Sequence, residues 1–211
     1  MIAIIDYGAS NLRSVTNAIR QLGYQPVVTS SARDITRANA VILPGVGAAP
    51  DTMANLAALG LVAPIKERIA AGQPFFGVCV GLQVLFTSTE EGGGHPCLGI
   101  IPGQVKRLPG GLKVPHMGWN QVKQLASHPL FREVPRAANF YFVHSYYAEP
   151  ADRSQVIGET SYGQPFASVI ARGNLVATQF HPEKSGEAGL KIYDNFIKLA
   201  QSHPKPPGGS P

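Results

Sequence analysis

The fold is decided by the stretch Phe75-Phe76-Gly77-Val78-Cys79-Val80-Gly81-Leu82-Gln83, which predicts a short apolar strand, a sharp turn and the start of a helix. The pattern Gly-x-Cys-x-Gly is the thiol form of the nucleophile elbow, in which glycines flank a turn too sharp for neighbouring side chains. A helix N-terminus carries partial positive charge, which favours the reactive thiolate. We therefore predict that Cys79 is a nucleophile standing above the end of a sheet. The alternative is a buried cysteine in a glycine-rich turn.

The first half of the chain alternates strand-like runs with segments of helical periodicity. The runs at 1–5, 25–29, 40–43 and 75–78 predict four strands, with helices between them. The first helix is expected from Ser10, whose side chain can cap it, to about Leu22. This order favours a parallel sheet sandwiched by helices, with the ligand site beyond the carboxyl ends of the strands. The turns after Ile5, Leu43 and Val78 all fall at that edge.

The second half of the chain predicts short β segments and one final helix capped by Ser185. The segments cover residues 104–108, 120–123, 139–143, 155–160, 166–171 and 174–180, with hairpin turns at 162–164 and 172–174. The predicted fold is α/β, with a central mixed, mostly parallel sheet flanked by helices and an added antiparallel β layer. Residues 1–201 form one predicted domain, and the proline- and glycine-rich residues 202–211 a predicted disordered tail.

A second polar motif, His181-Pro182-Glu183, follows the last predicted strand. An acid two positions beyond a histidine on extended chain lies on the same side, and the proline between them fixes the backbone. The carboxylate can orient one ring nitrogen and leave the other for a thiol. Cys79, His181 and Glu183 therefore form a candidate thiol triad. A polar strand exit before a helix is the alternative for this motif alone.

Composition excludes several classes of protein. The chain has 211 residues, 44% of them hydrophobic, and its net charge of +5 comes from scattered basic residues rather than the clustered patch of a nucleic-acid-binding protein. No apolar run is long enough to span a bilayer, and no signal-peptide pattern is present, so we expect a cytoplasmic protein without membrane contact. Two cysteines without metal-ligand spacing predict no metal site, and the absence of Gly-x-Gly-x-x-Gly argues against a nicotinamide or flavin cofactor.

These motifs together resemble the class I (triad) glutamine amidotransferases, whose usual elbow reads Gly-x-Cys-x-Gly-x-Gln. Within that family the chain resembles the glutaminase branch that serves imidazole glycerol phosphate synthase, over essentially residues 1–200. The stretches that carry the resemblance are DYG at 6–8 with Asn11 and Leu12, PGVG at 44–47, PHMGWN at 115–120, YFVHSY at 141–146 and HPEKS at 181–185. The fold implied is the flavodoxin-like one of this family, with no cofactor.

The resemblance implies a reaction that agrees with the triad. The Cys79 thiolate would attack the side-chain amide of glutamine, and His181, oriented by Glu183, would protonate the departing ammonia and then activate water to hydrolyse the thioester. The oxyanion would be held by backbone N–H groups of Val46, Gly47 and Val80. The residues implied in glutamine binding are Gly47, Gln83, Glu91, His144, Ser145 and Tyr146.

The resemblance also implies a partner that consumes the ammonia. This partner is the (β/α)8-barrel cyclase subunit, which would convert PRFAR into imidazole glycerol phosphate and AICAR during histidine biosynthesis in a heterodimer. The interface residues implied are Asn11, Trp119 and Tyr141. Because Gly45 and Gly47 let a peptide plane rotate cheaply, we expect the oxyanion donor to turn inward only in the liganded complex.

Three alternative functions stay open at this point. The chain could deliver ammonia to another acceptor, such as pyridoxal phosphate synthesis, although PHMGWN and DYG argue against it. It could be a cysteine peptidase or another thiol hydrolase, which release of glutamate from free glutamine would exclude. It could also be a non-catalytic binding module, in which case replacing Cys79 by alanine would leave its activity in the assembly unchanged.

Overall fold

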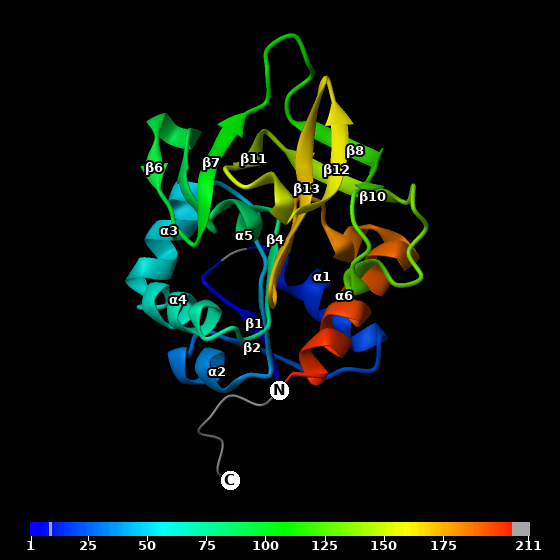
Figure 1. The fold of residues 1–211 in the computed structure, drawn as a ribbon. Helices are drawn as coiled ribbons and strands as arrows, with labels where there is room; N and C mark the ends of the chain where they lie inside the picture. Colours follow the sequence, from blue (N-terminus) through cyan, green and yellow to red (C-terminus); the bar gives the residue numbers. More distant parts are fainter. Residues whose placement is uncertain (9, 204–211) are drawn as a thin grey trace.

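The computed structural model describes residues 1–8 and 10–203. Strands and helices alternate in the first half of the chain, whereas strands dominate the second half until the final helix (Figure 1). The helices are α1 (Leu12–Gln21), α2 (Ala32–Arg37), α3 (Ala49–Ala58), α4 (Val62–Ala70), α5 (Val80–Gln83) and α6 (Gly186–Gln201). The strands are β1 (Ile2–Ile5), β2 (Pro26–Thr29), β3 (Ala40–Leu43), β4 (Phe75–Val78), β5 (Phe86–Thr89), β6 (His95–Pro96), β7 (Ile101–Arg107), β8 (His116–Gln121), β9 (Lys123–Gln124), β10 (Asn139–His144), β11 (Tyr146–Pro150), β12 (Val156–Tyr162), β13 (Gln164–Arg172) and β14 (Leu175–Thr178).

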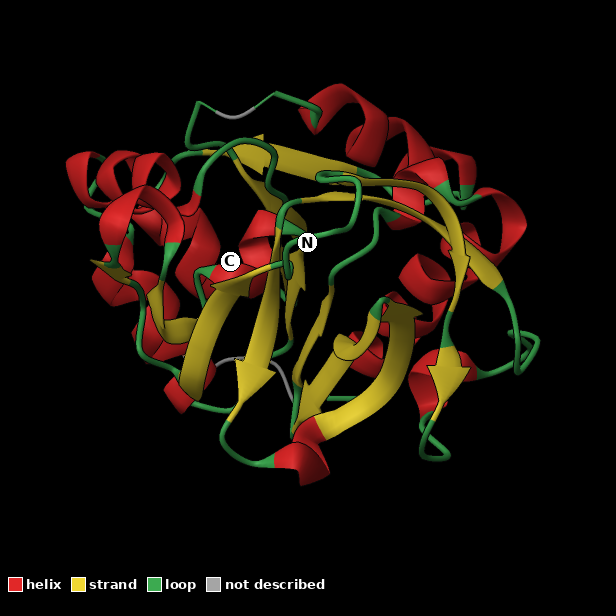
Figure 2. Ribbon diagram, turned by 90° about the horizontal axis from the view of Figure 1, so that it is seen from above, coloured by secondary structure: helices red, strands yellow, loops and turns green. Residues whose placement is uncertain are grey.

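One mixed sheet runs through the molecule, with helices on both of its faces (Figure 2). Its main path has the order β2-β1-β3-β4-β14-β13-β11-β7-β5-β6, and the first five of these strands are parallel. From β13 onward most pairings are antiparallel, and β8 pairs with β10 in a separate two-stranded sheet. The fold is therefore the predicted α/β arrangement with an added antiparallel layer.

The four strands predicted in the first half are confirmed, because β1, β2, β3 and β4 lie within the predicted runs. Since β1, β3 and β4 are parallel neighbours, the turns after Ile5, Leu43 and Val78 do meet at one edge. The predicted cap of the first helix was wrong. Helix α1 begins after Asn11, which adopts left-handed backbone angles (φ 81°) and makes no side-chain capping bond.

The second half departs from the predictions in detail. Strands β5, β6 and β11 were not predicted. Residues 174–180 supply β14, which pairs antiparallel with β13 and also parallel with β4, so it belongs to both parts of the sheet. The hairpin turns at 162–164 and 172–174 are confirmed, with Gly163 and Gly173 at positive φ. Ser185 does precede α6, but its hydroxyl makes no capping bond, because it donates to the carbonyl of His181 instead.

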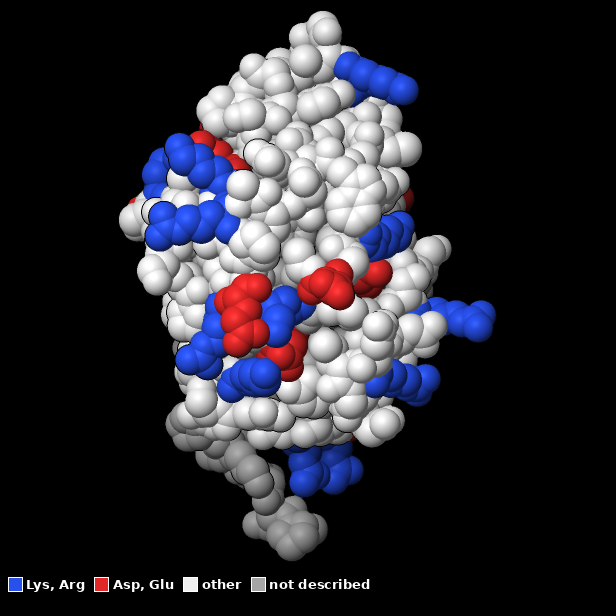
Figure 3. All heavy atoms as spheres, turned by 90° about the vertical axis from the view of Figure 1, so that its right-hand side faces the viewer, with Lys and Arg blue, Asp and Glu red and all other residues white. Residues whose placement is uncertain are grey.

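The core between sheet and helices is continuous and apolar, and it includes buried residues of both α1 and α6. No described helix is long and apolar enough to cross a membrane. On the face that Figure 3 shows, basic and acidic side chains are interspersed rather than gathered in one basic patch. Most of the predicted tail, residues 204–211, lies outside the described residues.

Candidate active site

Cys79 lies at the sharp turn between β4 and α5. Its backbone angles, φ 54° and ψ −107°, are strained for a residue with a side chain. Gly77 and Gly81 make the turn possible: a Cβ at Gly77 would meet the backbone of Gly81 at 2.5 Å, and one at Gly81 would collide with the carbonyl oxygen of Leu43. The backbone N–H of Cys79 donates to the carbonyl of Thr178 at 2.7 Å. The sheet therefore sets the position of the cysteine.

His181 and Glu183 form a buried pair beside this cysteine. Nδ1 of His181 and Oε1 of Glu183 are 2.8 Å apart, and their side chains are 1% and 0% exposed. Both backbone polar groups of His181 are hydrogen-bonded: its N–H donates to the carbonyl of Tyr141, and its carbonyl accepts from the hydroxyl of Ser185. Pro182 begins the short 3-10 helix Pro182–Lys184, which keeps Glu183 close to the ring.

The neighbours of His181 favour the protonated, charged form of its ring. Burial disfavours the charged ring, but Cys79 and then Glu183 outweigh burial and raise the pKa of His181 to about 10. Burial likewise opposes the charge of Glu183, but His181, the backbone and Asn11 outweigh it and lower the pKa of that carboxyl. Nε2 of His181 is buried without an aligned hydrogen-bond partner among the described residues, although Cys79 is close enough to act on it.

Two side chains that the motifs did not reveal hold the carboxylate of Glu183. The side-chain amide of Asn11 donates to Oε1 at 2.6 Å, and the buried hydroxyl of Tyr193 donates to Oε2 at 3.0 Å. The resemblance implied an interface role for Asn11, which stays a prediction; in the structure its side chain donates to Glu183. Tyr193 belongs to none of the sequence motifs, and its 10-residue separation from Glu183 gave no signal of the contact.

A cleft of about 420 Å³ opens over Cys79 and collects the predicted substrate and oxyanion residues. Gln83 and Glu91 also have protein partners: Nε2 of Gln83 donates to the carbonyl of Tyr146 at 2.9 Å, and Oε2 of Glu91 accepts from the N–H of Ala49 at 2.7 Å. The cleft is lined by Val46, Gly47, Cys79, Val80, Gln83, Glu91, Pro115, Val143, His144, Ser145, Tyr146, His181 and Lys184.

His144 begins a chain of hydrogen bonds whose direction is fixed. Its Nδ1 lies 2.8 Å from the carbonyl of Tyr146, which can only accept, so Nδ1 carries the proton. Nε2 of His144 then accepts from Nδ1 of His116 at 2.9 Å, and Nε2 of His116 accepts from Asn120 at 3.2 Å. Burial is the main cause that lowers the pKa of His144 to about 3, so this ring stays neutral.

The predicted interface residues Trp119 and Tyr141 lie on the two-stranded sheet. Trp119 is 59% exposed and packs edge-on against Tyr141, whose ring also faces the ammonium of Lys184 at 5.9 Å. Met117, next but one along β8, is 61% exposed. This exposed apolar surface near the cleft fits a docking role, which stays a prediction.

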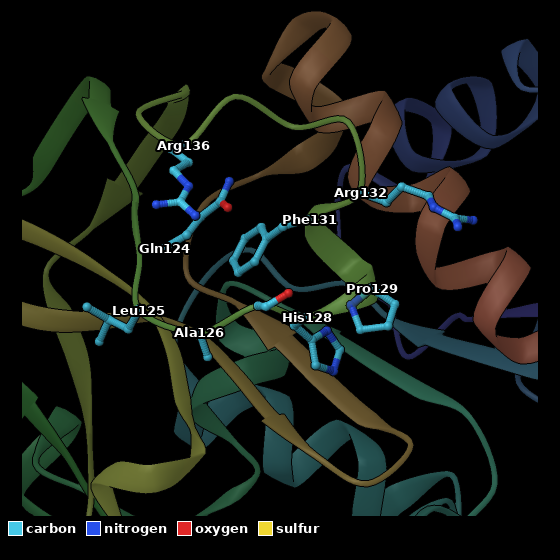
Figure 4. A pocket seen from close by; sticks show the side chains of 9 residues that line it. Gln124, Leu125, Ala126, His128, Pro129, Phe131, Arg132 and Arg136 are labelled. Carbon is cyan, nitrogen blue, oxygen red and sulfur yellow. The ribbon is translucent and has the colours of Figure 1, made fainter.

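A second, larger cavity of about 680 Å³ lies away from the cysteine, between the segment after β9 and the 3-10 helix Pro129–Phe131. Gln124, Phe131 and Arg136 point toward its interior, whereas Arg132 points away (Figure 4). None of the predicted site residues lines it. The described residues also include no group of three His, Cys, Asp or Glu side chains arranged to hold a metal ion. Of the predicted catalytic residues, Cys79 and His181 line the smaller cleft.

The model of the family "Glutamine amidotransferase class-I" matches residues 3–199. The chain is 58% identical over 200 residues to imidazole glycerol phosphate synthase subunit HisH of Dehalococcoides mccartyi (strain CBDB1), covering 95% of this chain and 98% of the relative. It is 54% identical to the HisH subunit of Moorella thermoacetica, covering 95% of each.

Solved structures share the fold at low sequence identity. A crystal structure of a glutamine amidotransferase matches with a TM-score of 0.76 and 18% identity, covering 95% of this chain and 100% of that one. The PurLQS structure from Thermotoga maritima matches with a TM-score of 0.73 and 16% identity, covering 94% and 97%.

The cysteine elbow, the buried histidine–glutamate pair and these matches agree on a class of enzyme that releases ammonia from glutamine. The chain belongs to the class I glutamine amidotransferase family, and within it to the family of HisH subunits of imidazole glycerol phosphate synthase. Enzymes of the class I family use a Cys-His-Glu triad, and this chain is a glutaminase of histidine biosynthesis.

Proposed function

We propose that Cys79, His181 and Glu183 are the triad of this glutaminase. The Cys79 thiolate attacks the side-chain amide carbon of L-glutamine, and His181 gives its proton to the departing nitrogen, so that ammonia leaves and a glutamyl thioester stays on the sulfur. His181 then takes a proton from water, which opens the thioester and releases glutamate. The carboxylate of Glu183 holds the ring in position through Nδ1.

The oxyanion of each tetrahedral intermediate needs backbone donors close to Cys79. The N–H of Val80 follows the nucleophile at the first turn of α5, as in other elbows. The second donor comes from Val46 or Gly47, which line the cleft opposite and whose loop includes the positive φ of Gly47 (103°). The position of this loop beside the sulfur supports its role.

Glutamine itself binds along the cleft. Gly47, Gln83, Glu91 and the segment 144–146 all line it. The backbone of His144, Ser145 and Tyr146 meets the α-carboxylate of the substrate. The chain of bonds from Tyr146 through His144 to His116 supports this role, because it holds the segment rigid.

The ammonia passes to a cyclase subunit, because free ammonia would be protonated and lost in water. As a subunit of imidazole glycerol phosphate synthase, this chain has a synthase partner. The partner is a (β/α)8 barrel that converts PRFAR into imidazole glycerol phosphate and AICAR, and the two chains form a heterodimer. Trp119 and Tyr141 contact it through the exposed sheet, together with Asn11. Two free cysteines fit a reducing, cytoplasmic location.

The observation that carries this proposal is the buried His181–Glu183 pair beside Cys79 on the floor of the cleft. The test measures glutamate release by the chain with its barrel partner and PRFAR, for the parent, Cys79→Ala and Cys97→Ala. Replacing Cys79 should lower turnover by about 10³-fold or more, since the thioester cannot form. Replacing Cys97, which is outside the cleft, should leave turnover unchanged. Activity retained by Cys79→Ala would refute the proposal.

A further inference from the structure

Among the described residues, Gln179 is the one side chain outside the sequence motifs that donates a hydrogen bond to Cys79. It follows β14 directly, and the parallel register that pairs Thr178 with Val78 sets it beside Cys79, which follows β4. Gln179 is 0% exposed, and its Nε2 lies 3.6 Å from the Cys79 sulfur. At this N···S distance the amide N–H can donate to the sulfur.

The orientation of this amide follows from a chain of bonds that begins at a backbone carbonyl. The carbonyl of Tyr146 can only accept, so the group of Gln83 that lies 2.9 Å from it is the NH₂. That same nitrogen lies 3.2 Å from the side chain of Gln179, which must therefore present its oxygen. The remaining end of Gln179, its NH₂, faces the sulfur.

We propose that Gln179 is a further catalytic residue, whose side-chain N–H stabilises the sulfur anion of Cys79. The inference rests on the proposed function of Cys79 as nucleophile. The N–H is in place before glutamine binds, and it again supports the sulfur when water opens the thioester and the thiolate leaves. It differs from the backbone oxyanion donors, because its acceptor is the sulfur and not the substrate oxygen.

The other groups around the sulfur do not replace this donor. The carbonyl of Val143, 3.9 Å from the sulfur, can accept from a thiol but cannot donate to a thiolate. The titratable groups that act on Cys79 are His181 and the buried Tyr7. The cleft wall adds Glu91, His144, Tyr146 and Lys184. Of these, His181 must give up its proton during the reaction, whereas an amide keeps its hydrogens at every step.

The test measures the pH dependence of alkylation of the full chain by iodoacetamide, in a Cys97→Ala background that leaves one thiol. Gln179→Met removes the donor, and we expect the midpoint of the profile to move up by about one pH unit, which is about tenfold less thiolate below the midpoint. Gln179→Glu keeps an acceptor for Gln83 but sets an anion beside the sulfur, so its midpoint should move further. Thr178→Val, which removes a buried hydroxyl one residue away, is the matched control and should leave the midpoint in place.

Turnover gives a second measurement of the same variants. With glutamine as substrate and the barrel partner present, Gln179→Met should lower kcat by about tenfold and change KM less than twofold, because the donor acts on the sulfur and not on the substrate. If Gln179 only positions Gln83, the alkylation midpoint of Gln179→Met will stay in place. That result would overturn the proposal, as would an equal shift in Thr178→Val.

If the Gln179 variants do not fold, the bond can still be tested by NMR in protein that keeps Gln179. The side-chain amide resonances of Gln179 should titrate with the same midpoint as alkylation and should lose that titration in Cys79→Ser. Resonances that do not change with pH would refute the bond. Alkylation does not depend on turnover, so an unmoved midpoint in Gln179→Met would count against the role of Gln179 alone. Glutamate release by Cys79→Ala would instead count against the proposed function.

Discussion

Two buried histidines, His181 and His144, have the same local geometry, but their pKa values are shifted in opposite directions. Each ring is almost fully buried, and each Nδ1 lies 2.8 Å from an oxygen. The oxygen is the carboxylate of Glu183 in one case and the carbonyl of Tyr146 in the other. The pKa of His181 is raised to about 10, whereas that of His144 is lowered to about 3.

The difference between the two rings comes from their neighbours and not from their burial. Burial disfavours the charged form of both rings, but His181 lies between a carboxylate and a thiol, whereas His144 lies between a carbonyl and a neutral imidazole. The carboxylate of Glu183 stabilises the protonated form of the His181 ring. Neutral neighbours make His144 a fixed link that supports the wall of the cleft.

Replacing Glu183 by glutamine would break the comparison, because both rings would then face neutral acceptors. We expect kcat for glutamine hydrolysis to fall by about 10²–10⁴-fold, as when the orienting acid of a triad is made neutral. By NMR, the titration of the His181 ring should move down from about pH 10, while that of His144 stays in place. An unchanged kcat would show that the carboxylate of Glu183 has no part in the reaction.

Replacing His144 by glutamine would test the neutral ring through the stability of the fold. In the parent, His144 has a pKa of about 3 when folded and about 6.5 when unfolded, so between these values the unfolded chain binds the extra proton. The free energy of unfolding should therefore fall as pH is lowered from 6.5 toward 3, by about 3 kcal/mol at pH 4 from this group. Urea unfolding of His144→Gln should lack that loss. The exposed His95→Gln is the control and should keep it.

Replacing Tyr193 by phenylalanine would sharpen the comparison with a smaller effect. The change leaves Oε2 of Glu183 buried without its donor, which should cost about 1–3 kcal/mol of unfolding free energy. Tyr24→Phe is the matched control, because Tyr24 makes the same kind of bond to Asp194 of α6 in a more exposed place. Its cost should stay within about 0.5 kcal/mol. Equal losses in urea unfolding would contradict a special role for the Glu183 contact.

Short motifs were enough to predict the elbow and the His-Pro-Glu segment, because their residues are neighbours in the chain. The parallel half of the sheet was predicted for a similar reason, since continuous apolar runs such as 40–43 mark strands covered on both faces. The contacts of Asn11 and Tyr193 with Glu183, and of Gln179 with Cys79, were missed. These contacts depend on which strands and helices meet, and a single sequence does not show that.

The predictions of helix caps and short strands were wrong for a different reason. Ser10 and Ser185 both have the chemistry of a cap, but α1 begins after Asn11 and the hydroxyl of Ser185 is used by the backbone of His181. Local propensity is overridden when a tertiary partner offers a better bond. Strand β6 has only two residues, and β5 reads Phe-Thr-Ser-Thr, so neither shows the continuous apolar run that marked β1 and β3.

The elbow glycines have a consequence for genetic suppression. A methyl group at Gly77 or Gly81 would meet main-chain atoms of Gly81 and Leu43, which every amino acid possesses. No second substitution can remove those atoms, so a defect at either glycine should have no suppressor elsewhere in the chain. Gly158 differs, because a methyl group there would meet side-chain atoms of Val169 and Val122, which glycine at position 169 and alanine at position 122 would remove.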